Sequence, residues 1–214
     1  WFAFLGAAGA GSLVYFVARA GSGGVTPVKL ALAGAVVTAL LSAWTSTLLL
    51  LDEETLDEAR FWLAGSLVGR GTEEMRLLTP LIAVALVGAL LMGGALNAFA
   101  LGEERAASLG QRIGTFRFFA GSISISLAAS AVAIAGPVAF IGLAVPHIAR
   151  SLVGPDYRWI TVLSMLIGSS LLLGADIVGR VVVSPRELQV GIVTALIGAP
   201  FLIYLVRSRK LAEL

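Results

Sequence analysis

The chain has 214 residues, of which 58% are hydrophobic and 13% are charged, with one His and no Cys. Soluble domains carry about 25% charged residues, so this composition excludes an ordinary water-exposed globule. The lack of Cys excludes thiol nucleophiles and thiolate-bound metals from these residues, and a single His argues against a His-rich metal centre or a Ser/His/Asp hydrolase. The pI is 9.4. Its basic residues flank apolar stretches, so nucleic acid binding is not indicated.

Long uncharged stretches separate the charged residues along the whole chain. They cover 1–18, 30–51, 77–102, 118–149, 159–175 and 188–206. A transmembrane helix needs roughly 20 apolar residues to cross about 30 Å of hydrocarbon. The alternating ten-residue strands of a transmembrane barrel are not visible. The pattern therefore predicts an all-α, polytopic transmembrane helix bundle.

The first half of the chain predicts three spans. A small-residue-rich helix over 1–18 is followed by a Gly- and Pro-containing loop at 20–28 and a second helix at 29–51. After an acidic stretch at Asp52–Glu58, residues 60–75 are interpreted as an interfacial loop. A third span is predicted at 77–96, and a polar stretch runs from Asn97 to Arg117.

The uncharged run at 118–149 is too long for one upright helix and contains Gly136-Pro137, which would break it. We therefore predict a full span at about 117–135 and a short helix at about 139–151. A short helix is tolerated at membrane depth only if protein or a water-filled cavity covers its ends. Two further helices are predicted at about 157–181 and 188–206, which gives seven membrane segments.

The loop charges predict the orientation of these segments. If the loops at 19–29, 97–117 and 150–158 share one side with the C-terminus, that side holds ten basic and four acidic residues. The opposite side then holds five basic and eight acidic residues, with Asp176 inside a helix. Cytoplasmic loops carry the excess of Lys and Arg, so the first side is predicted to be cytoplasmic.

A few residues within the predicted spans stand out. Asp176 is an intramembrane acid, which is by default a functional hypothesis, but Arg180 follows at i+4 and favours a structural ion pair. His147, next to Pro146, is interpreted either as a hydrogen-bonded helix–helix contact or as a gating or ligand residue. Gly191, Ala195 and Ala199 form a stripe of small residues every four positions, which is typical of a packing seam within a bundle or between subunits.

Four sequence blocks together resemble the FecCD-type permeases of ABC importers for iron-siderophores, haem and vitamin B12. They are GPVAFIGLAVPHIAR at 136–150, LNAFALGEERAASLG at 96–110, GADIVGR at 174–180 and VGIVTALIGAPF at 190–201. The family often has Leu-Pro before the last block, where this chain has Leu188-Gln189-Val190.

The resemblance implies one permease domain over 1–214 with a cytoplasmic coupling loop at about 97–113. Family members have ten transmembrane helices, so the seven segments correspond to the fourth through the tenth. Because the chain lacks an initiator Met and opens inside an apolar span, the first three are expected to be missing. The implied protein is not an enzyme, binds no cofactor or metal, and lies in the bacterial cytoplasmic membrane as a multi-pass subunit. The implied partners are membrane lipid, a second permease subunit in a homo- or heterodimer, two subunits that bind ATP and Mg, and an extracytoplasmic binding protein.

The resemblance also implies roles for individual residues. Those expected to couple to the ATPase are Asn97, Leu101, Gly102, Glu103, Glu104, Arg105, Leu109 and Gly110. Arg180 and Arg186 are expected to dock the binding protein, and Thr26 and Pro27 to lie at a cytoplasmic gate. Helix packing or the pathway is expected to involve Pro146, His147, Asp176, Gly191, Thr194 and Gly198.

The expected cargo is a ferric siderophore, with haem or cobalamin as alternatives. A secondary carrier or a membrane enzyme is the rival from another class. A carrier would show more intramembrane charge or an inverted repeat. An enzyme would show clustered catalytic residues at one membrane face. Neither pattern is visible in the sequence.

Overall fold

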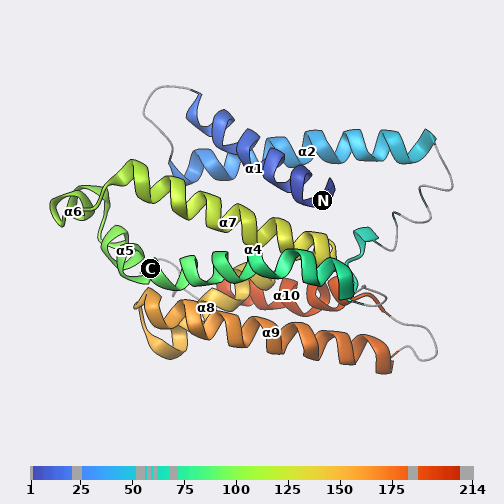
Figure 1. Cartoon of the computed structure of the whole chain (residues 1–214). Coiled ribbons are helices and arrows are strands. Elements are labelled where there is room, and N and C mark those ends of the chain that lie inside the picture. Colours follow the sequence, from blue (N-terminus) through green and yellow to red (C-terminus); the bar gives the residue numbers. More distant parts are fainter. Residues whose placement is uncertain are drawn as a thin grey trace.

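A computed structural model describes residues 2–20, 26–51, 56, 59, 62–67, 72–182 and 188–207, and no strand occurs among them. Figure 1 shows long helices lying roughly side by side. The helices are α1 (Phe2–Arg19), α2 (Pro27–Leu51), α4 (Thr72–Leu91), α5 (Gly93–Ala100), α6 (Glu103–Ser108), α7 (Ile113–Ala135), α8 (Ile141–Val153), α9 (Tyr157–Val182) and α10 (Val190–Arg207). The predicted all-α class is confirmed.

Four of these helices, α1, α2, α7 and α9, are long and apolar enough to cross a membrane. A fifth candidate is the pair α4 and α5, which is bent by 47°. The helix α8 and the segment Val190–Phe201 of α10 are shorter apolar helices. All seven predicted segments are thus helical, and the described residues give four or five full-length spans, with the predicted short helix at α8.

The third predicted span, 77–96, differs most from the structure. The helix begins earlier, at Thr72, ends at Leu91 and turns into α5. Two glycines, Gly93 and Gly94, follow the bend. Glycine has a low helix propensity, so an uninterrupted helix is less stable at this point. A side chain at Gly93 would meet the Cγ of Arg158 at 2.9 Å, so the start of α9 occupies the space beside the bend.

The helix ends sort into two groups, as the loop charges predicted. Figure 1 shows α6 and the turn from α8 to α9 at the end of the molecule where α1 ends and α2 begins. The described basic residues near this end include Arg19, Lys29, Arg105, Arg112, Arg117, Arg150 and Arg158. At the opposite end lie the start of α4 and the end of α9. Successive loops therefore lie at alternate ends of the bundle, and the short helix α8 is a separate element, as this alternation requires.

Residues 62–67, which belong to the predicted interfacial loop at 60–75, pack between the ends of helices. The Gly65 backbone N–H donates to Trp62 O, the Ser66 N–H donates to Ala135 O at 2.8 Å, and Gly65 O accepts the Gly191 N–H at 3.2 Å. The segment therefore joins the end of α7 to the start of α10. Buried backbone outside regular secondary structure needs hydrogen-bond partners within the protein, and these contacts provide them.

Small residues fill the buried contacts between helices. Ala106, Ala129 and Ala149 are fully buried, while large apolar side chains such as Trp44 and Val84 are more than 60% exposed. Lipid is as apolar as Leu, so helices in a membrane associate through close packing of small residues and leave large ones outside. This inverted distribution fits a multi-pass membrane protein.

Candidate functional site

The most prominent feature at the basic end of the bundle is the short helix α6. It projects from the bundle between α5 and α7 (Figure 1) and begins after Gly102. The coupling corner, defined here as residues 101–110, contains all of the predicted ATPase-coupling residues except Asn97. Gly102 has φ +103° and ψ 151°, a conformation essentially restricted to glycine, so the direction in which α6 leaves α5 depends on this residue.

The coupling corner is fixed to the bundle from one side only. Ala106 is fully buried, the Arg117 guanidinium pairs with the Glu103 carboxylate, and the Phe99 and Phe116 rings stack with centroids 3.8 Å apart. The ion pair joins the corner to the start of α7, and the ring stack joins α5, which precedes the corner, to the same helix. The corner is therefore a positioned projection and not a free loop.

The other side of the corner is open. Leu101 and Leu109 are 55% and 63% exposed, and Glu104 is exposed as well. The Arg105 guanidinium donates to Leu101 O at 3.5 Å and is also exposed. Two large apolar side chains beside charged ones on a projection make a surface suited to a protein partner.

Asn97 lies elsewhere. Its side chain is half-buried and points to the start of α9, where Nδ2 donates to Asp156 Oδ1 at 2.7 Å and Oδ1 accepts the Tyr157 backbone N–H at 2.8 Å. The Arg158 N–H also donates to Asp156 Oδ1, at 3.0 Å. Asn97 and Asp156 thus cap the first turn of α9, satisfying backbone donors that would otherwise lack partners.

The Asp156 carboxylate is stabilised in its charged form. The hydrogen bond from Asn97 lowers its pKa below the usual 3.8, with further contributions from the Arg158 backbone N–H and the Arg158 charge, against a smaller opposing effect of burial. Because the folded-state pKa is lowered, this stabilisation is present at neutral pH. It is lost only as the pH falls below the pKa of an ordinary Asp and through the lowered pKa of Asp156. The capping arrangement is therefore intact throughout the physiological range.

Asp176 and Arg180 form the predicted i,i+4 ion pair near the end of α9, with Arg180 Nε 2.8 Å from Asp176 Oδ2. The Arg180 side chain remains 46% exposed, whereas that of Asp176 is 15% exposed. Arg180 therefore presents part of its guanidinium to the surroundings while it neutralises the acid. Arg186, the second predicted docking residue, lies outside the described residues.

The two predicted gate residues stand at the start of α2. Thr26 is exposed, and its Oγ1 accepts the Lys29 backbone N–H at 3.3 Å, as an N-cap does. Pro27 is the first residue of the helix, a position that proline favours because its missing N–H has no intrahelical partner there. Helix-start chemistry accounts for both residues, and their gating role stays a prediction.

His147 and Pro146 lie within α8. The His147 ring Nδ1 is 2.8 Å from Leu143 O of the same helix, and the side chain is half-buried. This contact lies within α8, and the predicted roles of His147 in a helix–helix contact, at a gate or as a ligand stay predictions. Pro146 is accommodated inside α8, where the helix continues to Val153.

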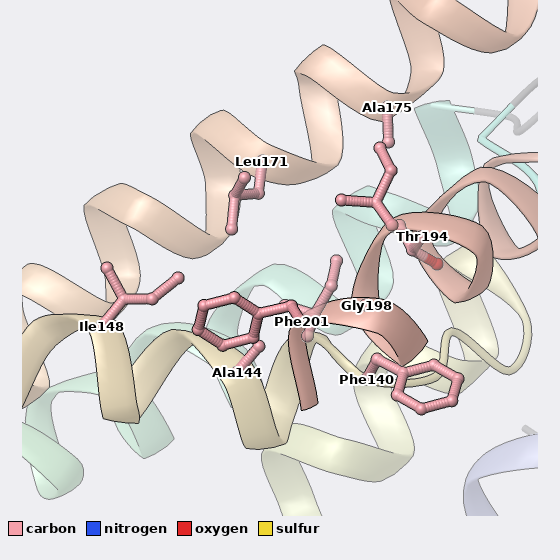
Figure 2. A pocket seen from close by; sticks show the side chains of 10 residues that line it. Phe140, Ala144, Ile148, Leu171, Ala175, Thr194, Gly198 and Phe201 are labelled. Atoms are coloured by element: carbon pink, nitrogen blue, oxygen red, sulfur yellow. The ribbon is translucent and has the colours of Figure 1, made fainter. Parts of the chain in front are cut away.

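A cavity of about 250 Å³ lies between α8, α9 and α10. Figure 2 shows Ala144 and Ile148 facing Leu171 and Ala175 across it, with Thr194, Gly198 and Phe201 from α10. Thr194 is the one polar side chain of the lining, and its hydroxyl donates to Gly191 O at 3.0 Å. The cavity therefore has an apolar wall with no free polar group to hold a hydrophilic chelate.

A larger open groove of about 970 Å³ follows the outer face of α10. Its walls are residues 63–64, residues 137–140, and the α10 face that carries Gly191, Ala195 and Ala199. The predicted small-residue stripe thus has two roles: all three residues line the groove, and Gly191 also packs closely against Ala64.

Phe140 separates the cavity from the groove and was not predicted. It lines both, and it has φ +68°, which is unusual for a bulky residue. Its side chain packs so closely on Gly198 that a Cβ there would lie 2.4 Å from Phe140 Cβ. Gly198 is therefore a packing residue.

Asp156 was also missed by the sequence analysis. It follows Gly154-Pro155 and precedes an apolar span, and this pattern is an N-cap signal. Among the described residues, no group of three or more His, Asp or Glu side chains gathers as a metal site would require.

Comparison with known proteins places these features in a family. The chain is 43% identical over 97% of its length to a Bacillus subtilis (strain 168) permease, YfiZ, named as a probable siderophore transport system protein. It is 45% identical over 97% of its length to the Escherichia coli (strain K12) ferric enterobactin transport system permease protein FepD. In both cases it spans 62% of the relative.

A solved structure has the same fold. It is described as an inward-facing conformation of a metal-chelate type ABC transporter, with a TM-score of 0.85 and 32% sequence identity over 95% of this chain and 65% of the other. The sequence profile of the FecCD transport family matches residues 1–208, which include the coupling corner, α8 and α10. The chain therefore belongs to the FecCD transport family.

Proposed function

We propose that this chain is the transmembrane permease part of an ABC importer, and that the coupling corner binds a cytoplasmic ATPase subunit. The observation that carries the proposal is the exposed, bundle-anchored helix α6 at the basic end of a membrane bundle. Its open side carries Leu101, Glu104 and Leu109. Membership of a transport family and likeness to a metal-chelate ABC transporter support this assignment.

The proposal assigns ATP hydrolysis to the partner subunits, so the chain itself is not an enzyme and holds no cofactor. ATP and Mg would be bound by two such subunits. A second permease subunit would complete the translocation pathway, and the groove along α10 is the surface we assign to that pathway. The importer would lie in the bacterial cytoplasmic membrane and receive its cargo from an extracytoplasmic binding protein.

The proposed cargo is a ferric-siderophore-type iron chelate. The support comes from the relatives, whose names refer to siderophore and ferric enterobactin transport. The apolar groove agrees with selection by size more than by charge. Uptake of radiolabelled ferric chelates, haem and cobalamin by cells carrying the full-length importer tests this choice, and uptake of haem or cobalamin alone would overturn it.

Leu109→Asp should weaken binding of the ATPase subunits by on the order of tenfold or more, because it places a charge in the apolar part of the proposed interface. The measurement is co-purification of the ATPase subunits with the full-length permease, together with uptake. Leu152→Asp is the matched control, since Leu152 is 66% exposed against 63% for Leu109 and lies at the end of α8. Equal losses in both variants, or normal assembly of Leu109→Asp, would contradict the proposal.

We also propose that Arg180 docks the binding protein through its exposed guanidinium. Arg180→Gln should weaken binding-protein association by about 1.5–3 kcal/mol, the range for a hydrogen bond to a charged group. Asp176→Asn is the control, because it removes the intramolecular pair but keeps the cation. Association is measured by surface binding to the importer in nanodiscs. If the two variants bind equally, Arg180 serves only its pair with Asp176.

A further inference from the structure

The coupling corner reaches the rest of the bundle through α5. The helix α6 packs on α5 and α7, and α5 packs on α9. Any displacement of α6 by a partner must therefore pass along α5 or α7 before it reaches the helices that line the cavity and the groove.

The bend before α5 separates it from α4. The two helices meet at Met92 at 47°, and the Gly93-Gly94 pair lets Arg158 of α9 come close. At Gly94, an added Cβ would lie 3.3 Å from the Arg158 Nη2. The helix α5 thus packs against the start of α9 and does not continue in the direction of α4.

Asn97 joins α5 to α9 directly. It binds Asp156 and the Tyr157 N–H, residues about 60 positions away in sequence, through two bonds of 2.7 and 2.8 Å. Both atoms of its amide are used, so the orientation of the side chain is fixed. A residue needed only for solubility of a loop would not be held in this way.

The start of α9 is joined in turn to α8. Arg150 of α8 donates from Nη2 to the Tyr157 hydroxyl at 2.5 Å, and its guanidinium lies 5.2 Å from the centre of the Tyr157 ring. The helix α8 begins after Phe140, which lines both the cavity and the groove. A continuous set of contacts therefore runs from α6 to the pathway side of the bundle.

We propose that Asn97 is a positioning residue that transmits movement of the coupling corner to α8 and α9 through Asp156, and that it does not itself contact the ATPase. This inference rests on the proposed function and deepens it. Mere proximity does not demonstrate energetic coupling between sites, so the test must perturb the link and restore it.

The Asn97–Asp156 pair allows such a restoration. Asn97→Asp places two carboxylates together and breaks the link, since neither can donate. In the swap Asn97→Asp with Asp156→Asn, the new amide donates to the new carboxylate, which still accepts the Tyr157 N–H. The swap therefore restores the link between α5 and α9, although the amide group that faces residue 97 no longer accepts the Arg158 N–H. Thr161→Val is the matched control, because it removes a 2.7 Å hydrogen bond to Tyr157 O on the same helix without touching α5.

The first measurement is cargo transported per ATP hydrolysed by the full-length importer in proteoliposomes. Asn97→Asp should lower this ratio on the order of tenfold, within the range of coupling mutations. Co-purification of the ATPase subunits should be unchanged. The swap and Thr161→Val should retain the ratio of the unmodified importer. Loss of the ratio in the swap, or an unchanged ratio in Asn97→Asp, would overturn the inference.

The second measurement is independent of the ATPase. Spin labels on Ser108→Cys and Leu152→Cys, both exposed positions, report the distance between α6 and the end of α8 in the full-length permease. The distance distribution should be narrow in the unmodified protein and the swap, and broad in Asn97→Asp. Equal widths in all three would overturn the positioning role. Failure of the ATPase subunits to bind the unmodified permease would instead contradict the proposed function, while the label result would still decide the positioning role.

Discussion

Replacing Gly191 by Ala should disrupt the packing of residues 62–67 on the start of α10, and so destabilise the folded protein and lower its yield. The added Cβ would lie 2.2 Å from Ala64 O and 3.3 Å from Pro137 O. Both are backbone atoms, and Gly65 O is held by the Gly191 N–H, so residues 62–67 cannot move aside without breaking that bond. Overpacking of this kind costs typically about 1–3 kcal/mol, and contact with fixed backbone places this variant at the upper end.

The sign of this effect is diagnostic. In an open helical position, Gly→Ala is favourable by about 1 kcal/mol because Ala restricts the unfolded chain and favours the helix. Gly174→Ala on α9 is the matched control, since no atom lies within 4 Å of its added Cβ. Thermal denaturation of the full-length permease in detergent, followed by size-exclusion chromatography, measures both. Equal stability of Gly191→Ala and Gly174→Ala would show that residues 62–67 do not pack on α10.

Gly102→Ala should abolish most uptake while leaving membrane insertion intact. Nothing lies within 4 Å of an added Cβ, so the effect does not come from a clash. It comes from φ +103° with ψ 151°, where a non-glycine residue is strained by about 1–3 kcal/mol. The chain relieves that strain by turning α6, which moves Leu109 and Glu104 away from the proposed ATPase surface.

Uptake by cells and protein level in the membrane measure this prediction. We expect uptake to fall on the order of tenfold. This fall corresponds to a shift of about 1.4 kcal/mol in the equilibrium between the correctly oriented and the turned corner. Gly114→Ala is the control, because Gly114 lies in the first turn of α7, has open space around it and does not carry a positive φ. Full uptake by Gly102→Ala would mean that the orientation of α6 is not needed for coupling.

The sequence by itself determined the elements that depend on short-range order. The apolar runs predicted helices at 117–135, 139–151 and 157–181, and the structure has Ile113–Ala135, Ile141–Val153 and Tyr157–Val182. In a membrane, the backbone must satisfy its own hydrogen bonds, so a long apolar run forms a helix whatever surrounds it. The Asp176–Arg180 pair was predictable for the same reason, because helix geometry brings i and i+4 together.

The tertiary structure alone decided the contacts between segments far apart in the chain. Asn97 was expected on the coupling surface with Leu101 and Leu109, since it stands in the same polar stretch, but its side chain turns to Asp156. Residues 62–67 and Phe140 occupy packed positions that no periodic pattern marks. Which face of α5 meets α9, and where the third span bends, depend on how glycines such as Gly93 let neighbouring helices approach. Such approach is a property of the packed pair, and neither sequence segment carries it by itself.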